Sequence, residues 1–227
     1  RDGGGRHSGQ REHPARHGRY HPRGGESDFR PGKKCPFKLY QPVPVGRAGA
    51  KLCAALEESG LADNTIVVFT SDHGEMNQSH GLVFKSQLLE EATRTPLIIS
   101  GPKVKKNIVD SINLTCGIDL VPTICDLAGI PIPENLSGKS LKPILTGEAN
   151  KIDRDYIIIE SSSGYQINDG RYKYTTFTRG NKKESLMDIS IDPGEMSDKS
   201  ADSAYATTKR RLQHLLMKDI KRITENI

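Results

Sequence analysis

The sequence is poor in the residues that mark several common classes of protein. It has no tryptophan and only four cysteines, and no hydrophobic run approaches the roughly 18 residues of a membrane-spanning helix. No cysteines form a C-x-x-C pair, which argues against zinc and redox motifs. We therefore predict no membrane span, and buried, inert thiols at Cys35, Cys53, Cys116 and Cys125.

The excess of positive over negative charge is confined to one end of the chain. The 33 Lys and Arg residues exceed the 28 Asp and Glu residues by five, and residues 1–34 hold this entire excess. This segment has almost no apolar side chains, so it cannot bury enough surface to offset the entropy lost on ordering. We predict a disordered basic leader, with a basic arm for nucleic acid or an acidic glycan as the alternative. The balanced charge of the remaining residues argues against a specific nucleic-acid partner.

Helical and β-branched segments alternate up to about residue 150. Residues 65–70 form a continuous β-branched and aromatic run, which is typical of a strand buried on both faces of a parallel sheet. This alternation predicts an α/β fold. The remaining predicted elements are strands at 36–40 and 96–100, an extended segment at 108–114, and helices at 46–58, 86–93 and 119–127.

The pattern changes after residue 150. Several short strands follow one another, and the turn residues Asn168, Asp169 and Gly170 indicate a hairpin between two of them. A helix with one apolar stripe ends the sequence. We predict a small antiparallel sheet with one helix, formed by strands at 156–160, 165–167, 172–177 and 185–188 and a helix at 203–223.

One cluster of residues suggests chemistry. Asp72 and His73 follow the strand at 65–70, at the sheet edge where α/β proteins bind ligands. A carboxylate and an imidazole can hold a divalent cation, and Lys85 could return a positive charge to the same place. Together they would suit a tetrahedral oxyanion. Taken alone, an Asp-His pair after a strand is more often a turn with a helix cap.

The surrounding sequence resembles the sulfatase family, within the alkaline-phosphatase superfamily. The resemblance covers about residues 50–200 and implies an α/β fold in which a mixed, alkaline-phosphatase-like sheet is flanked by helices. It is carried, in order, by segments 56–75 (including TIVVFTSDHGE), 80–85, 90–99, 119–130, 138–141, 170–174, 186–188 and 192–195.

The resemblance also implies roles for individual residues. Asp72 and His73 match metal ligands, usually for Ca²⁺, although a histidine ligand slightly favours a softer ion. Lys85 matches the catalytic-site lysine that contacts the sulfate, and His80 lies in the same catalytic loop. The family implies a sulfated small molecule or glycan as substrate and an exported location. Nothing in the sequence indicates an oligomeric state.

The sequence also departs from the family. The C/S-x-P/A-x-R motif that supplies the formylglycine nucleophile is absent, and the segment Cys35–Lys38 is a poor match to it. An early Asp-Asp pair for the metal is also missing, and sulfatases are longer than this chain. We therefore predict the C-terminal part of a sulfatase catalytic domain at 35–150 and an α+β subdomain at 151–227, inactive alone. The alternatives are a phosphodiesterase or phosphonate monoester hydrolase of the same superfamily, or a non-catalytic fragment that binds anions or glycans.

Overall fold

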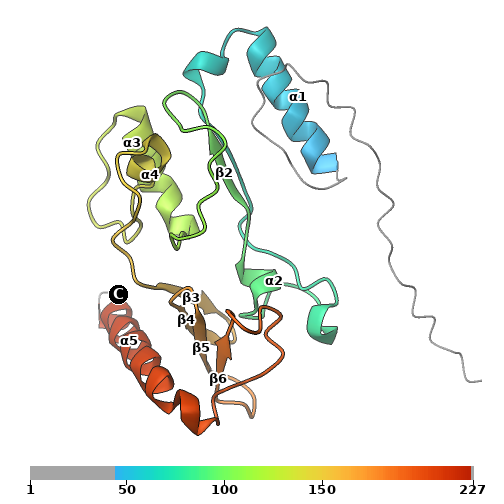
Figure 1. Ribbon diagram of the computed structural model, residues 1–227, viewed down its shortest axis with the longest axis vertical. Coiled ribbons are helices and arrows are strands. Elements are labelled where there is room, and N and C mark those ends of the chain that lie inside the picture. Colours follow the sequence, from blue (N-terminus) through green and yellow to red (C-terminus); the bar gives the residue numbers. More distant parts are fainter. Residues whose placement is uncertain (1–43, 226–227) are drawn as a thin grey trace, which may run out of the picture.

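The computed structural model describes residues 44–225, and these form two regions (Figure 1). One region contains the predicted α/β elements, and the other contains a four-stranded sheet with a long helix. Three predictions fall outside the described residues: the leader at 1–34, the thiol of Cys35 and the strand at 36–40. The first region comprises helices α1 (Pro44–Glu58), α2 (Glu90–Thr93), α3 (Leu120–Ala128) and α4 (Lys142–Thr146), strands β1 (Val67–Thr70) and β2 (Leu97–Ser100), and 3-10 turns at Ala62–Asn64, Ser79–Gly81 and Gly117–Asp119.

Strands β1 and β2 pair with each other in an antiparallel ribbon. Val68 lies opposite Ile99, and Thr70 lies opposite Leu97. The prediction that 65–70 lies in a parallel sheet is therefore wrong for the pairing described, and both strands are only partly buried. A β-branched run indicates an apolar environment, but it does not encode the direction of the neighbouring strand.

The helices agree in part with the sequence prediction. The helix predicted at 119–127 is confirmed by α3, which is capped by Gly129 with a φ of 71° in the left-handed region. The helix predicted at 86–93 is wrong for its first half, because α2 begins only at Glu90. Residues 86–89 are not helical, and the backbone oxygens of Ser86 and Leu88 accept hydrogen bonds from the C-terminal sheet. Helix α4 was not predicted, and no strand forms at 108–114.

The second region is an antiparallel meander in the order β3-β4-β5-β6. The predicted hairpin is confirmed: Gly170 has a φ of 89°, and the backbone N–H of Tyr172 donates to Asp169 Oδ1 at 2.7 Å. All four strands were predicted within one or two residues. Their bounds are β3 (Ile157–Ser161), β4 (Gly164–Asn168), β5 (Tyr172–Phe177) and β6 (Glu184–Asp188), followed by a 3-10 turn at Ser203–Tyr205 and helix α5 (Ala206–Glu225).

The two faces of this sheet are covered differently. One face packs against the predicted apolar stripe of α5, in a core formed by Ile167, Tyr174, Leu186, Leu212 and Leu216. Burying each of these side chains contributes about 1.5–3 kcal/mol. The opposite face is also buried but polar, with Gln166, Lys173 and Thr175 almost inaccessible to solvent. The segment around α2 lies over this polar face (Figure 1).

Two further predictions from the sequence, on membrane spans and on cysteines, concern the described residues. No helix within 44–225 is long and apolar enough to span a membrane. Cys53 is buried, whereas Cys116 and Cys125 are only half-buried. Burial, together with the nearby Asp119 carboxylate, raises the pKa of the Cys116 thiol to about 11, so this thiol is unreactive at neutral pH.

Candidate active site

The loop between β1 and α2 brings together three of the four predicted site residues. The carbonyl oxygen of Gly74 can only accept a hydrogen bond, so His73 Nδ1, at 2.6 Å from it, carries the proton. The lone pair of His73 Nε2 is then free to accept. Lys85 Nζ lies 2.7 Å from this nitrogen, and Asp72 Oδ2 lies 3.3 Å from it. Residues twelve positions apart therefore meet at one imidazole.

The carboxylate of Asp72 is in its charged form at neutral pH. Desolvation acts to raise the pKa of this exposed carboxyl, but the hydrogen bond from the His73 backbone N–H and the nearby Lys85 ammonium hold the pKa below its ordinary value. An ionised carboxylate beside an imidazole lone pair is a donor set that suits a divalent cation.

His80 lies apart from the other three residues. Its ring is largely buried, and Nε2 lies 3.7 Å from Glu91 Oε1 on α2. Its φ of 54° places its backbone in the left-handed region. Among the described contacts, no hydrogen bond or ion pair joins it to Asp72, His73 or Lys85. The structure therefore links His80 to the support of the loop rather than to the cluster itself.

Two glutamates and a glycine hold the loop in place. The backbone N–H of Gly74 donates to Ala92 O at 2.9 Å, and a Cβ at Gly74 would stand 1.9 Å from Glu91 O. No side chain fits there, because the loop backbone lies directly against α2. Near the other end of the loop, Glu75 Oε1 accepts from the Phe84 N–H at 2.6 Å. No role was predicted for Glu75 or Glu91, although Glu75 belongs to the DHGE motif.

The side chains present fit a divalent cation as part of a ligand set. Right-angled ligands with bonds of about 2.3–2.4 Å stand roughly 3.3 Å apart, which is also the distance between Asp72 Oδ2 and His73 Nε2. Within the described part of the chain, no group of three or more His, Cys, Asp or Glu side chains could hold a metal ion. Asp72 and His73 could thus supply two ligands at most, fewer than a closed metal site requires.

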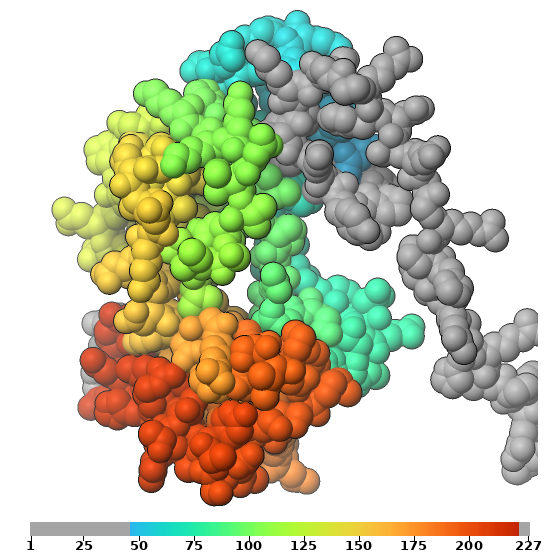
Figure 2. All heavy atoms as spheres, in the orientation of Figure 1, coloured from blue at the N-terminus to red at the C-terminus, as the bar shows by residue number. Residues whose placement is uncertain are grey.

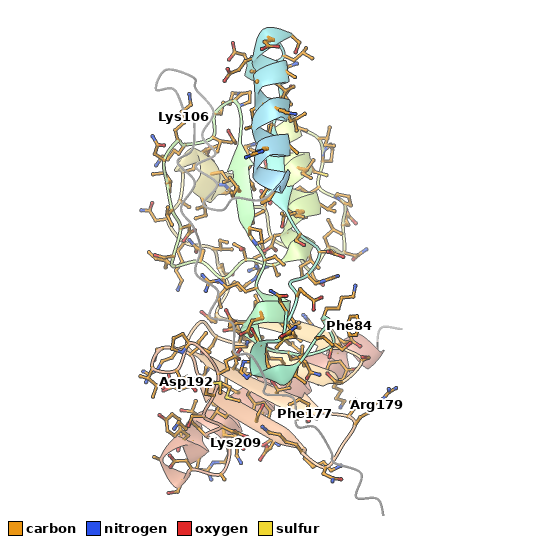
Figure 3. All side chains as sticks on the ribbon, turned by 90° about the vertical axis from the view of Figure 1, so that its right-hand side faces the viewer. Phe84, Lys106, Phe177, Arg179, Asp192 and Lys209 are labelled. Atoms are coloured by element: carbon orange, nitrogen blue, oxygen red, sulfur yellow. The ribbon has the colours of Figure 1, made fainter. Side chains whose placement is uncertain are left out.

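A cavity lies elsewhere, between β2, the segment at 104–115 and α4. Its volume is about 380 Å³, and most of its lining is apolar, including Ile99, Val104 and Leu145. It contains none of the residues of the Asp72 cluster. The charged cluster instead lies on a surface loop, and Figure 3 shows the labelled Phe84, the neighbour of Lys85, on the flank of the molecule near α2.

The chain is similar in sequence and in structure to known sulfatases and to a phosphonate monoester hydrolase. A Delta 4,5-hexuronate-2-O-sulfatase of Bacteroides thetaiotaomicron is 39% identical over 163 residues, which cover 67% of this chain and 34% of that relative. A solved 2-O GAG sulfatase matches with a TM-score of 0.71 and 35% identity, over 78% of this chain and 41% of that one. A phosphonate monoester hydrolase from Silicibacter pomeroyi matches with a TM-score of 0.69 and 30% identity, over 78% of this chain and 39% of that one.

These matches confirm the α/β, alkaline-phosphatase-like fold predicted from the sequence. The chain spans about a third of the length of the curated relative it matches. The family model for the C-terminal part of N-sulphoglucosamine sulphohydrolase matches residues 78–222. The resemblance drawn from the DHGE motif and the segments around it is thereby confirmed, and the chain belongs to this sulfatase family.

Proposed function

We propose that the chain supplies part of the active site of a sulfatase, an enzyme that hydrolyses sulfate esters. The convergence of Asp72, His73 and Lys85 carries this proposal. Sulfate-ester cleavage requires positive charge on the nonbridging oxygens while a nucleophile attacks sulfur. Lys85 is placed to supply one such charge. The C/S-x-P/A-x-R nucleophile motif does not occur in these 227 residues, so we expect no turnover by this polypeptide on its own.

The proposed roles follow from the contacts of each side chain. Asp72 and His73 would hold a divalent cation, which supplies Lewis-acid charge to the sulfate oxygens. Among divalent ions we propose Ca²⁺, with the imidazole as a ligand that also suits softer metals. The Gly74 carbonyl keeps the proton on Nδ1, so the Nε2 lone pair, which Lys85 contacts, could bind the ion. His80 serves the same loop through its contact with Glu91.

The relatives indicate a class of substrate. One is a hexuronate 2-O-sulfatase, and the matched structure is a 2-O GAG sulfatase. We therefore propose a 2-O-sulfated glycan as substrate. The proposal also includes an exported location and the division of the chain at about residue 150 into a catalytic part and a subdomain. The phosphonate monoester hydrolase match keeps a second candidate open, because the same charges suit a tetrahedral phosphonate.

A binding experiment with the 227-residue chain separates these candidates. We would record the His73 ring signals by NMR, in the presence of Ca²⁺, while adding an unsaturated 2-O-sulfated uronate disaccharide or a phosphonate monoester. The disaccharide should shift these signals, and Lys85→Ala should weaken its binding by about tenfold, because a charge-assisted hydrogen bond is lost.

The matched control is Lys106→Ala, which removes the same charge from an exposed lysine that lies well away from the labelled Phe84 (Figure 3). Equal weakening by both variants would mean that the disaccharide senses only net charge, and the sulfatase proposal would fail. Stronger binding of the phosphonate than of the disaccharide would support the second candidate instead.

A further inference from the structure

The segment from Ser86 to Glu90, which follows Lys85 and leads into α2, is hydrogen-bonded to the C-terminal region at every second residue. Ser163 Oγ donates to Ser86 O at 3.0 Å, and Gln166 Nε2 donates to Leu88 O at 2.6 Å. The backbone N–H of Glu90 donates to a carboxylate oxygen of Glu195 at 2.6 Å. The alternation is that of an extended strand whose one side faces the sheet. Lys85 lies directly before this attached segment.

A buried network of charges completes the attachment. The ammonium of Lys173 on β5 lies 2.7 Å from Glu195 Oε1 and 3.1 Å from Glu90 Oε1. The side chain of Lys173 is fully inaccessible to solvent, and that of Glu195 is 1% exposed. Within the described residues, Glu195 Oε1 has only the Lys173 ammonium as a partner. Loss of this lysine would leave a buried carboxylate unpaired, which is strongly unfavourable.

The opposite side of α2 holds the active-site loop. Ala92 O accepts the Gly74 N–H, and Glu91 Oε1 lies near the His80 ring. Glu90, Glu91 and Ala92 are consecutive residues of one short helix. The helix therefore connects the Lys173 network on one side with the backbone beside His73 on the other.

We propose that Lys173 and Glu195 are positioning residues for the active site. They act through Glu90 and α2, which fix the backbone of Gly74 and thereby the imidazole of His73 beside Asp72 and Lys85. Neither residue reaches the cluster itself. This proposal rests on the proposed function only in treating Asp72, His73 and Lys85 as the active site.

A second lysine–glutamate pair in the same subdomain provides a matched control. Lys209 on α5 lies 2.7 Å from Glu184 Oε1 on β6, and both side chains are partly exposed. It joins the helix to the sheet and has no described contact with α2. In Figure 3 the labelled Lys209 lies well away from Phe84 and the active-site loop.

The experiment compares Lys173→Met with Lys209→Met in the 227-residue chain. Each variant removes one lysine charge from one glutamate-paired site. We would measure the hydrogen exchange of the Gly74 N–H and the ring signals of His73, well below the unfolding midpoint of each variant. Lys173→Met should speed exchange at Gly74 by about tenfold and shift the His73 signals, because the support of the loop opens locally. Lys209→Met should leave both readouts at their wild-type values.

A gentler variant covers the case in which Lys173→Met does not fold. Glu195→Gln keeps an acceptor for the Glu90 N–H but weakens the attraction to Lys173, so it should change both readouts in the same direction by a smaller amount. A purely structural role would lower the unfolding midpoint while the Gly74 exchange rate and the His73 signals stay unchanged, and that result would overturn the proposal. Equal changes in Lys209→Met would do the same. Since no readout uses sulfate or turnover, such a failure would leave the sulfatase proposal intact.

Discussion

The two regions of the molecule differ in how completely they bury their apolar side chains. The C-terminal sheet and α5 enclose a closed core around Tyr174, Leu212 and Leu216. In the first region, by contrast, both strands are only half-buried, and most of the exposed large apolar side chains lie there, with Val109 at 90% exposure. The space-filling view shows the sheet and α5 packed together in the lower lobe (Figure 2). The active-site loop between β1 and α2 belongs to the less buried region, but the segment that follows it is hydrogen-bonded to the better packed one.

Breaking the charge pair that bridges the two regions should have the largest effect. Arg154, just before β3, donates to both carboxylate oxygens of Asp119 at 2.6 and 2.7 Å, and Asp119 is fully buried at the start of α3. Arg154→Ala would leave this carboxylate without its guanidinium, at a cost of about 3–5 kcal/mol in the free energy of unfolding. Urea denaturation measures the loss. Lys139→Ala, which breaks the exposed pair with Asp153, should cost less than about 1 kcal/mol. Similar losses in both variants would contradict the prediction.

Truncating matched side chains in the two regions tests the difference in packing directly. Leu216→Ala removes a fully buried side chain of the C-terminal core and should cost about 2–5 kcal/mol. Ile99→Ala on β2 removes a partly buried one and should cost clearly less. Both values come from urea denaturation of the 227-residue chain. If Ile99→Ala cost as much as Leu216→Ala, the two regions would be equally well packed, contrary to the comparison.

A substitution at Gly74 tests the attachment of the loop. An alanine methyl would stand 1.9 Å from the Glu91 backbone oxygen, so either the loop or α2 must move. We expect Gly74→Ala to cost about 1–3 kcal/mol and to shift the His73 ring signals. Gly117→Ala is the control, because a Cβ there meets nothing within 4 Å. Unchanged His73 signals in Gly74→Ala would show that the loop is not held by its contact with α2.

Acid should weaken the link between the two regions. Burial acts to raise the pKa of Asp119, but the hydrogen bonds from Arg154 and from the backbone of Lys139 and Cys116 hold it below its ordinary value. A lowered folded-state pKa stabilises the protein above the unfolded pKa of about 3.9, and this stabilisation is lost as the pH falls toward the folded value. The unfolding midpoint of the wild type should therefore drop below about pH 4. Asp119→Asn should lose less over the same range, and an identical acid dependence would argue against the prediction.

Local sequence patterns predicted most of the elements and the convergence of Asp72, His73 and Lys85, because strand periodicity, turn residues and motif spacing are local signals. The pairing direction of β1 could not be predicted, since it depends on which strand lies alongside. The burial of Lys173 could not be predicted either. This lysine alternates with Tyr172 and Tyr174 on β5, so the pattern places it on a polar face that would normally meet solvent. Its partners, Glu90 and Glu195, are distant in sequence, and only the fold reveals that this face is covered.

The smallest expected effect concerns the competition between Lys85 and a cation for His73. The Lys85 ammonium lies 2.7 Å from the same Nε2 atom that would bind the ion. The chain alone should bind Ca²⁺ weakly, because Asp72 and His73 would supply only two of the roughly six to eight ligands that this ion takes. Lys85→Ala should strengthen that binding modestly, by removing both a repulsive charge and a competitor for the lone pair. Asp72→Asn should abolish it, and Lys106→Ala should leave it unchanged. Calorimetry measures these affinities. If Lys85→Ala weakened Ca²⁺ binding, the lysine and the cation would not compete for His73. Tight binding by the unaltered chain would mean that it supplies further ligands besides Asp72 and His73.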